Sequence, residues 1–305
     1  MTQEIYDVAV IGEGVSGLTA ANLLATGGAK VATFEAQLFG GLVINVNEFE
    51  PRPDEREMSG AEFAAELMQA NAELGVTSIQ EAVTGISNDG ALIRVTTAGA
   101  TYAARQVIVA SGARLRKLGI PGEAEFEGHG VSQCADCDGP MYQNEEAVVV
   151  GGGDSALQEA LVLAQFCSKV HLVHRGGSFR ARKHFVEQVN TNPKIATIWN
   201  ATVERITGSS MVETVCVKLG DGRVQDIPCA GIFAYIGLAP NSEFLPPQVK
   251  RDESGLVATN ESLETPMAGV WAIGAVRQGY SGLLRDAAFE ARSVTERISK
   301  RLASD

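Results

Sequence analysis

Two cysteines with the spacing of a redox pair stand beside an acid and a glycine. Residues 134–137 read Cys-Ala-Asp-Cys, and Asp138 and Gly139 follow directly. A thiol pair at this spacing takes part in thiol–disulfide exchange, which moves two electrons at a time. The attacking group is a thiolate, so Asp138 is placed to move a proton beside the second cysteine. The alternative interpretation of Asp138 is an ordinary solvated acid in a turn.

The chain also contains two glycine-rich turns of the kind that binds dinucleotides. Residues 7–17 and 146–156 align with each other, and each copy reads as strand, tight glycine turn and helix start, with another strand after the helix. Such a turn brings backbone N–H groups and a helix N-terminus to a pyrophosphate. An ordinary turn is the alternative for either copy. The predicted contacts are Gly12, Gly14, Val15, Ser16 and Gly17 in the first copy, and Gly151, Gly153, Asp154, Ser155 and Ala156 in the second.

The two copies end differently, and the difference predicts different nucleotides. The first copy ends in Glu35, an acid that suits ribose hydroxyls and repels a 2′-phosphate, so this copy favours FAD. The second copy ends in His174 and Arg175, and further basic residues, including Arg180, follow up to residue 184 with no acid among them. In a chain of net charge −12, this run favours a phosphate site for NADPH over a solvated basic face.

Length and composition indicate a globular chain of two domains. The chain has 305 residues, of which 45% are hydrophobic and 20% charged. A pI near 4.9 argues against a nucleic-acid partner, which would need a broad basic surface. No apolar run is long enough to cross a bilayer, and the first residues lack the basic start and apolar core of a signal peptide. We therefore expect a cytoplasmic protein without a membrane partner.

The remaining cysteines do not extend the pair into a metal site or a disulfide framework. A structural zinc site needs four ligands, and no second Cys pair or His pair has a suitable spacing. Cys167, Cys216 and Cys229 lie in apolar patterns and are predicted to be small core residues. In a reducing compartment, a close pair is more often catalytic than structural, so a catalytic dithiol is preferred over zinc.

The order of the predicted elements indicates one domain inserted into another. Residues 1–114 contain the first glycine turn, residues 115–241 contain the cysteines and the second turn, and residues 242–305 return with a strand and a final helix. We expect an α/β fold of two Rossmann-like domains, each of three layers (ββα). Two helices carry apolar stripes, namely Phe63, Leu67, Ala70 and Leu74, and Leu284, Ala287, Ala291, Val294 and Ile298.

Taken together, the motifs resemble those of the low-molecular-weight thioredoxin reductase family. The likeness covers nearly the whole chain and rests on the order of the motifs. After the first glycine turn come Ser-Gly-Ala at 111–113, Ile-Pro-Gly at 120–122, the cysteine run, the second glycine turn, and His-Arg with Phe-Arg-Ala at 174–181. The resemblance implies a homodimeric flavoprotein with an NADPH domain inserted into an FAD domain. Its substrate would be a thioredoxin-like protein or a small disulfide.

The resemblance also implies roles for single residues. Cys137 would face the flavin ring, Cys134 would exchange with the substrate disulfide, and Asp138 would be the acid/base. Arg175 and Arg180 would hold the 2′-phosphate of NADPH. The residues implied to line the FAD site, beyond those named above, are Gly41, Asn45, Val83, Gly112, Gly274, Ala275, Arg285, Asp286 and Ala287.

The chain departs from the family at several nucleotide-binding positions. The family has a second arginine where Gly176 stands, so one phosphate clamp is missing. An aspartate that holds the ribityl chain of FAD is replaced by Ala275. The glutamine after the paired glycines is Leu42, and the Glu-Asn pair is Glu-Pro at 50–51. The segment 274–285 is also longer than usual, whereas the dithiol is intact.

We therefore predict an enzyme that passes electrons from NADPH through FAD to Cys134 and Cys137, and on to a thioredoxin-like disulfide. One alternative is a relative without NADPH chemistry, either a dithiol oxidase that uses oxygen or a reductase fed by ferredoxin. Another is a binding or regulatory flavoprotein without turnover. Retention of both cysteines and of Asp138 weighs against the last alternative.

Overall fold

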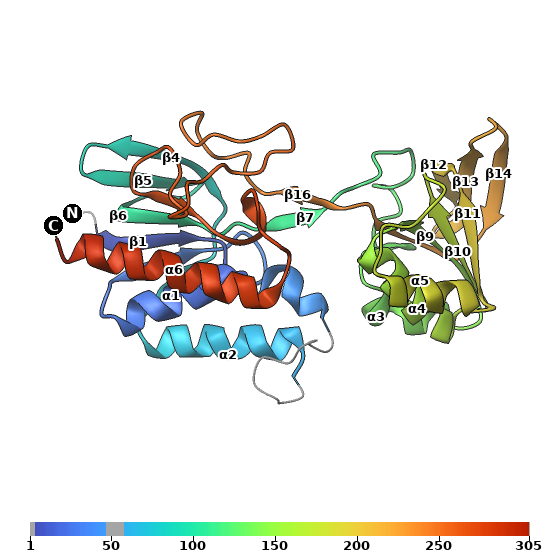
Figure 1. Cartoon of the computed structure of the whole chain (residues 1–305), viewed down its shortest axis with the longest axis horizontal. Helices are drawn as coiled ribbons and strands as arrows, with labels where there is room; N and C mark the ends of the chain where they lie inside the picture. The colour runs from blue at the N-terminus through green and yellow to red at the C-terminus, as the bar shows by residue number, and fades with distance from the viewer. Residues whose placement is uncertain (1–3, 47–57, 305) are drawn as a thin grey trace. The chain divides into compact units, whose positions relative to one another are not determined.

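The chain forms two compact units, and the second is inserted into the first. The computed structural model describes residues 4–46 and 58–304. The first unit comprises Met1–Arg114 and Ala239–Asp305, and the second comprises Leu115–Leu238. Where the chain passes between them, β7 (Ala113–Leu115) and β16 (Leu238–Pro240) form a two-stranded sheet. Each unit is α/β with parallel strands, which confirms the predicted fold class (Figure 1).

A seven-stranded sheet forms the centre of the first unit. Its strands are β1 (Ile5–Ile11), β2 (Val31–Phe34), β3 (Thr77–Ile79), β4 (Val83–Asp89), β5 (Leu92–Thr97), β6 (Thr101–Val109) and β17 (Val270–Ala272). The order is β3-β2-β1-β6-β5-β4, and β17 also pairs with β6. The pairs β4–β5 and β5–β6 are antiparallel, and the other pairs are parallel. β1 and β2 are apolar on both faces, as strands buried on both sides must be.

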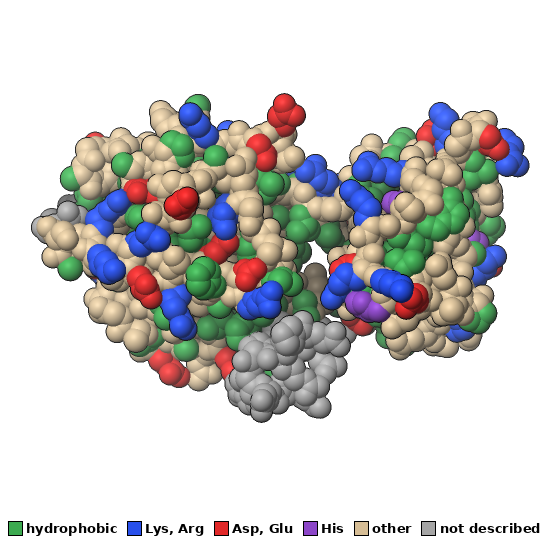
Figure 2. Space-filling model, in the orientation of Figure 1, with side chains coloured by type: hydrophobic (Ala, Val, Ile, Leu, Met, Phe, Trp, Pro, Cys, Tyr) green, Lys and Arg blue, Asp and Glu red, His purple; other side chains and the backbone are tan. Residues whose placement is uncertain are grey.

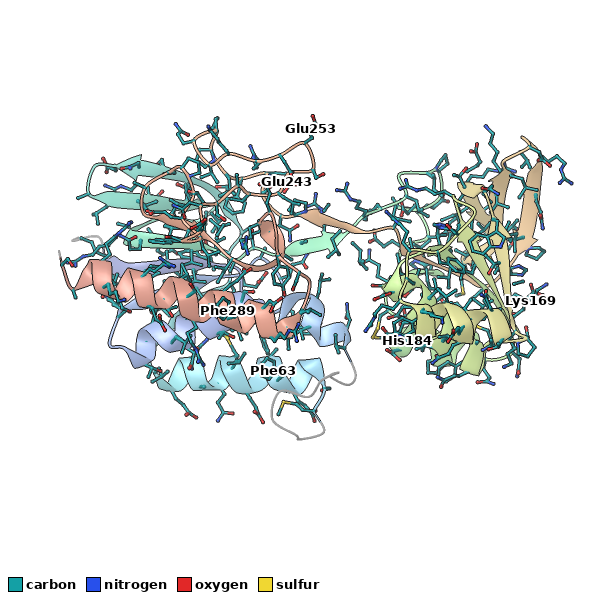
Figure 3. All side chains as sticks on the ribbon, in the orientation of Figure 1. Phe63, Lys169, His184, Glu243, Glu253 and Phe289 are labelled. Atoms are coloured by element: carbon teal, nitrogen blue, oxygen red, sulfur yellow. A yellow bond between two sulfur atoms is a disulfide. The ribbon has the colours of Figure 1, made fainter. Side chains whose placement is uncertain are left out.

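Three helices lie on one side of this sheet (Figure 1), namely α1 (Val15–Thr26), α2 (Gly60–Glu73) and α6 (Leu284–Leu302). α6 packs beside α1 over the sheet, because its Ala291, Val294 and Ile298 share one apolar cluster with residues of α1, β1 and β6. These residues and Ala287 are buried, which confirms the predicted stripe of the last helix. Phe289, on the outer side of α6, is 72% exposed (Figure 3).

The stripe predicted for α2 is wrong in part. Leu74 is 43% exposed, whereas the side chains of Ala64 and Asn71 are buried. Asn71 donates from Nδ2 to the backbone oxygen of Leu18 in α1, at 3.1 Å. That buried hydrogen bond turns the helix so that a polar residue, which a search for apolar periodicity passes over, faces α1.

The second unit has three layers. Its central parallel sheet has the order β11-β10-β9-β15-β8. The strands are β8 (Val131–Ser132), β9 (Glu146–Gly151), β10 (Lys169–His174), β11 (Ile195–Trp199) and β15 (Gly231–Tyr235). One face packs on α3 (Ala135–Asp138), α4 (Asp154–Phe166) and α5 (Lys183–Thr191). The other packs on an antiparallel sheet of β12 (Ala201–Gly208), β13 (Val212–Leu219) and β14 (Val224–Pro228) (Figure 1).

Short 3₁₀ helices occur at Gly41–Asn45, Gly139–Tyr142 and Gly274–Val276. Among the described residues, no helix combines the length and apolar character that a bilayer crossing requires. Acidic and basic side chains are interspersed over the face of each unit that Figure 2 shows. Cys167, Cys216 and Cys229 are buried free thiols, as predicted.

Candidate functional site

The cysteine pair lies in the first turn of α3, in the second unit. A disulfide joins Cys134 to Cys137, with 5.3 Å between their Cα atoms. Residues three apart on a helical turn face each other, so the CxxC spacing alone brings the two sulfurs together. Cys134 occupies the N-cap position, and its sulfur accepts the N–H of Cys137 at 3.1 Å. Cys137 is exposed and Cys134 is half-buried.

A serine that the sequence analysis missed fixes Asp138 beside the pair. The hydroxyl of Ser132 donates to Oδ2 of Asp138 at 2.5 Å, and the hydroxyl oxygen of Ser132 accepts the N–H of Cys134 at 3.2 Å. Asp138 is therefore held in a defined position next to both cysteines rather than free in a turn. The signal for this was available, because a serine two residues before a helix start often bonds to the turn that follows it.

Glu159 on α4 is a second acid that the sequence analysis missed. Its Oε2 accepts the N–H of Ala135 at 3.1 Å and the hydroxyl of Tyr235 at 3.2 Å. Burial raises the pKa of Glu159, and the hydrogen bond from Ala135 opposes that shift. This carboxyl ties the backbone between the two cysteines to the helix that begins at the second glycine turn.

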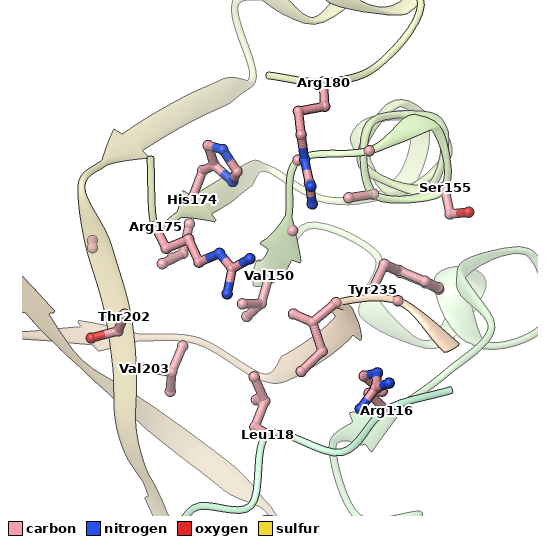
Figure 4. Close-up of a pocket in the computed structure, with 18 of the residues that line it drawn as sticks. Arg116, Leu118, Val150, Ser155, His174, Arg175, Arg180, Thr202, Val203 and Tyr235 are labelled. Atoms are coloured by element: carbon pink, nitrogen blue, oxygen red, sulfur yellow. The ribbon is translucent and has the colours of Figure 1, made fainter. Parts of the chain in front are cut away.

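The second glycine turn borders a cavity of about 520 Å³ (Figure 4). The cavity lies at the carboxyl ends of β9, β10 and β15, which is where open parallel sheets bind ligands. A Cβ added to Gly153 would meet no atom within 4 Å, so the backbone at the start of α4 is open to a ligand. Every residue predicted for the second site lines this cavity, namely Gly151, Gly153, Asp154, Ser155, Ala156, His174, Arg175 and Arg180.

The basic run after β10 divides into two parts. Arg175 and Arg180 line the cavity, whereas Arg182 donates from its backbone N and from Nε to the carboxylate of Asp154, at 2.7 Å each. The sequence contains no acid within the run, but α4 brings one to it from a distance. The carboxylate of Asp154 therefore holds the loop 180–182 in place. Two arginines, rather than the whole run, remain for a phosphate.

His174 is packed at the wall of the cavity. It is 8% exposed, and its Nε2 lies 3.0 Å from the backbone oxygen of Ser178. Its ring contacts those of Phe179 and Trp199. The histidine therefore shapes the loop that carries Arg175 and borders the cavity itself.

The first glycine turn forms a close-packed cradle in the first unit. A Cβ added to Gly17 would lie 2.0 Å from the backbone oxygen of Gly12, so only glycine lets α1 start this close to β1. By contrast, a Cβ on Gly14 would meet only a backbone oxygen at 3.9 Å. The N-terminus of α1 is therefore open at the position where a pyrophosphate binds. Gly41 lies beside it, because a Cβ there would be 3.5 Å from Cα of Gly14.

Two acids stand behind this cradle. Glu35 accepts the N–H of Glu13 at 2.9 Å, and its other oxygen accepts two N–H groups of the chain that follows. Glu13, which the sequence analysis missed, is fully buried and accepts the hydroxyls of Thr33 at 2.5 Å and Ser78 at 2.6 Å. These bonds fix the end of β2, where Glu35 would meet a ribose.

The turn at Gly274 lies against the first glycine turn and is anchored by α6. A Cβ on Gly274 would lie 2.5 Å from the hydroxyl of Ser16, so the turn at Gly274 is in close contact with the first glycine turn. Ala275 offers no carboxylate. Glu290 of α6 accepts the N–H of Gly274 at 2.8 Å and pairs with Arg277, so both of its oxygens are engaged within the protein. Nε of Arg277 is buried without a partner among the described residues.

The other residues predicted for the FAD site are partly brought together. Val15 and Ala287 share an apolar cluster with Val43 of the 3₁₀ helix that runs from Gly41 to Asn45. Val83 packs against the core cluster on the sheet, and the backbone oxygen of Gly112 accepts the N–H of Asn241 at 2.9 Å. On α6, Arg285 is exposed and the carboxylate of Asp286 accepts the hydroxyl of Ser281. Leu42 is 40% exposed. The departure at 50–51 lies outside the described residues. An open helix N-terminus between glycines fits the pyrophosphate of FAD.

Comparison with known proteins shows to which family the chain belongs. Residues 6–291 match the family model of pyridine nucleotide-disulphide oxidoreductases. The chain is 36% identical over 274 residues to a thioredoxin reductase of Treponema pallidum, covering 89% of each chain. It is 37% identical over 276 residues to the bifunctional thioredoxin reductase/thioredoxin of Mycobacterium leprae, covering 89% of this chain and 60% of that one.

A solved structure agrees with these sequence comparisons. The crystal structure of Lactococcus lactis thioredoxin reductase aligns with a TM-score of 0.92 at 33% identity, over 98% of this chain and all of that one. The resemblance stated from the motifs is thereby confirmed. The chain belongs to the pyridine nucleotide-disulphide oxidoreductases, and within them to the low-molecular-weight thioredoxin reductase family.

Proposed function

We propose that this enzyme uses NADPH and FAD to reduce the disulfide of a thioredoxin-like protein, and that Cys134 and Cys137 carry the electrons. The observation that carries the proposal is the dithiol turn, in which Ser132 fixes Asp138 beside the pair. The name of the Mycobacterium leprae relative supports the partner, because that chain is both a reductase and a thioredoxin. A homodimer is part of the proposal.

The members of this family use FAD and NADPH, and so does this chain. We assign FAD to residues 1–114 and 242–305, where the cradle at Gly14 and Ser16 is open to a pyrophosphate. We assign NADPH to residues 115–241, where Arg175 and Arg180 line the cavity. FAD bound in that cradle would supply the two-electron redox chemistry that links NADPH to the disulfide.

The residues of the chain complete the transfer by exchange. The Cys134 thiolate attacks the substrate disulfide, forms a mixed disulfide and releases one substrate thiolate, which takes a proton. The Cys137 thiolate then attacks the sulfur of Cys134, releases the second substrate thiolate, which takes a proton, and restores the Cys134–Cys137 disulfide. Asp138 accepts the proton of Cys137 as that thiol ionises. The substrate thus gains two electrons and two protons.

Single serine variants test these roles. Cys134→Ser and Cys137→Ser should both lose NADPH-dependent reduction of thioredoxin, because neither can form the internal disulfide. In Cys134→Ser the remaining thiolate lies beside oxidised flavin, so a long-wavelength charge-transfer band should appear. Cys137→Ser should lack that band and should trap a mixed disulfide with thioredoxin. Cys216→Ala, which alters a buried cysteine outside the turn, is the control and should retain turnover.

The same variants separate the alternatives. A band in Cys137→Ser instead of Cys134→Ser would reverse the two roles. Full turnover in both variants would show that the pair is not catalytic. A bound flavin that NADPH leaves oxidised would favour the relative without NADPH chemistry. Reduction of that flavin by ferredoxin would indicate the ferredoxin-fed reductase. Reduction of the flavin by a dithiol substrate, followed by reoxidation by oxygen, would indicate the dithiol oxidase.

A further inference from the structure

Arg116 is a cationic wall residue of the nucleotide cavity that the motifs do not mark. Its backbone N–H donates to the oxygen of Gly237 and its Nε donates to the oxygen of Leu238, each at 2.9 Å. The first bond anchors the backbone of Arg116 and the second holds its side chain at the segment that follows β15. The terminal nitrogens of its guanidinium pair with no carboxylate within the described parts of the chain. All three arginines line the cavity, and Figure 4 shows Arg116 apart from Arg175 and Arg180.

The strand order determines which half of a dinucleotide reaches each arginine. β9 is central, with β10 on one side and β15 on the other. In this fold the pyrophosphate lies at the helix N-terminus after the first strand, and residues at the end of the next strand read the adenosine ribose. Here that next strand is β10, which leads to Arg175. The nicotinamide half must then extend over the end of β15, where Tyr235, Ile236 and Gly237 line the cavity.

We propose that Arg116 binds the nicotinamide half of the nucleotide, through the phosphate on that side. A guanidinium whose Nε is held by a backbone oxygen, on a residue whose own backbone is anchored, is preorganised to make charge-assisted hydrogen bonds with a phosphate. Such a contact is common to NADPH and NADH, because both have this phosphate. Arg175 and Arg180, beside β10, bind the 2′-phosphate that only NADPH carries. Arg116 thus adds affinity and not selectivity, and supplies a cation in a cavity where Gly176 has removed one.

Three probes distinguish this role from a structural one. NADP⁺ has both halves and the 2′-phosphate, NAD⁺ has both halves without it, and 2′,5′-ADP has the adenosine half alone. The experiment measures the dissociation constant of each probe for the flavin-loaded oxidised enzyme by calorimetry. Arg116→Ala should weaken NADP⁺ and NAD⁺ by about tenfold or more and leave 2′,5′-ADP unchanged. Arg175→Ala is the matched control and should weaken NADP⁺ and 2′,5′-ADP while leaving NAD⁺ unchanged.

Each other outcome overturns the inference. Equal weakening of all three probes by Arg116→Ala would mean that the residue only supports the chain after β15. Unchanged binding of NADP⁺ would mean that Arg116 does not touch the nucleotide. If Arg116→Ala does not fold, Arg116→Gln takes its place with the same expectations. The inference depends on the proposed use of NADPH, and the two fail differently. A wild-type enzyme that binds no NADP⁺ overturns both, whereas an Arg116 variant with wild-type constants overturns only this one.

Discussion

At residue 275, a methyl group stands where the resembled family has a carboxylate for the ribityl chain of FAD. Glu290 does not replace that carboxylate, because one of its oxygens accepts the N–H of Gly274 and the other pairs with Arg277. Loss of a hydrogen bond to a charged group weakens binding by about tenfold to a hundredfold. We therefore expect FAD to be held weakly and purified protein to be partly empty.

Restoring the carboxylate should reverse this effect. In the Ala275→Asp variant, the dissociation constant of FAD should fall by about tenfold. Titration of the apoprotein with FAD, followed by quenching of flavin fluorescence, measures the constant without any turnover. An unchanged constant in this variant would show that another contact has taken over the role.

Cys229 predicts how the fold responds to alkaline pH. Burial raises the pKa of this thiol from its ordinary value of 9.0 to about 12. Above pH 9 the unfolded chain loses this proton while the folded chain keeps it, so the free energy of unfolding falls as pH rises from 9 to 12. Between pH 8 and pH 10 this one group should lower that free energy by about 1.4 kcal/mol.

Urea denaturation of the wild type and of Cys229→Ala at the two pH values measures this effect. Other groups titrate in the same range, so the difference between the two proteins isolates the thiol. The variant should lose less stability from pH 8 to pH 10 than the wild type does. Equal losses would mean that the thiol ionises in the folded protein as easily as in the unfolded one.

At the scale of elements, α6 holds the first unit together by one face only. Ile298 is fully buried in the cluster between α6, α1 and the sheet, whereas Phe289 on the outer side is 72% exposed. Ile298→Ala should lower the free energy of unfolding by about 2–5 kcal/mol, because it removes buried methyl groups and leaves a cavity. Phe289→Ala should change it by less than about 0.5 kcal/mol. Chemical denaturation of both variants checks the pair, and similar losses would contradict the packing described here.

The elements also show which features a sequence can predict. The stripe of α6 followed from apolar spacing because a long helix against a sheet must bury one face. The stripe of α2 did not, because its contact with α1 is made by Ala64 and Asn71, a small residue and a buried polar one. Periodicity detects large apolar side chains, so a face built from other residues escapes it.

At the scale of the whole molecule, the sequence motifs identified the glycine turns and the cysteine pair, but not the residues that hydrogen-bond to them or complete their cavity. The two glycine turns and the CxxC have local spacings, so the sequence predicts them directly. Ser132, Glu159 and Arg116 act through hydrogen bonds to residues that folding brings near, and no short pattern marks them. The pairing of Arg182 with Asp154 likewise joins residues 28 positions apart. Supporting contacts of this kind need the tertiary fold.

The most direct test of the central claim is an anaerobic titration of the oxidised, flavin-loaded enzyme with NADPH, followed by flavin absorbance. The account predicts that the wild type takes up about two equivalents per chain, since the flavin and the Cys134–Cys137 disulfide each accept two electrons. A variant with both cysteines changed to serine should take up about one. A flavin that stays oxidised under excess NADPH, or equal uptake by the two proteins, would contradict the claim that electrons pass from NADPH through FAD to the dithiol.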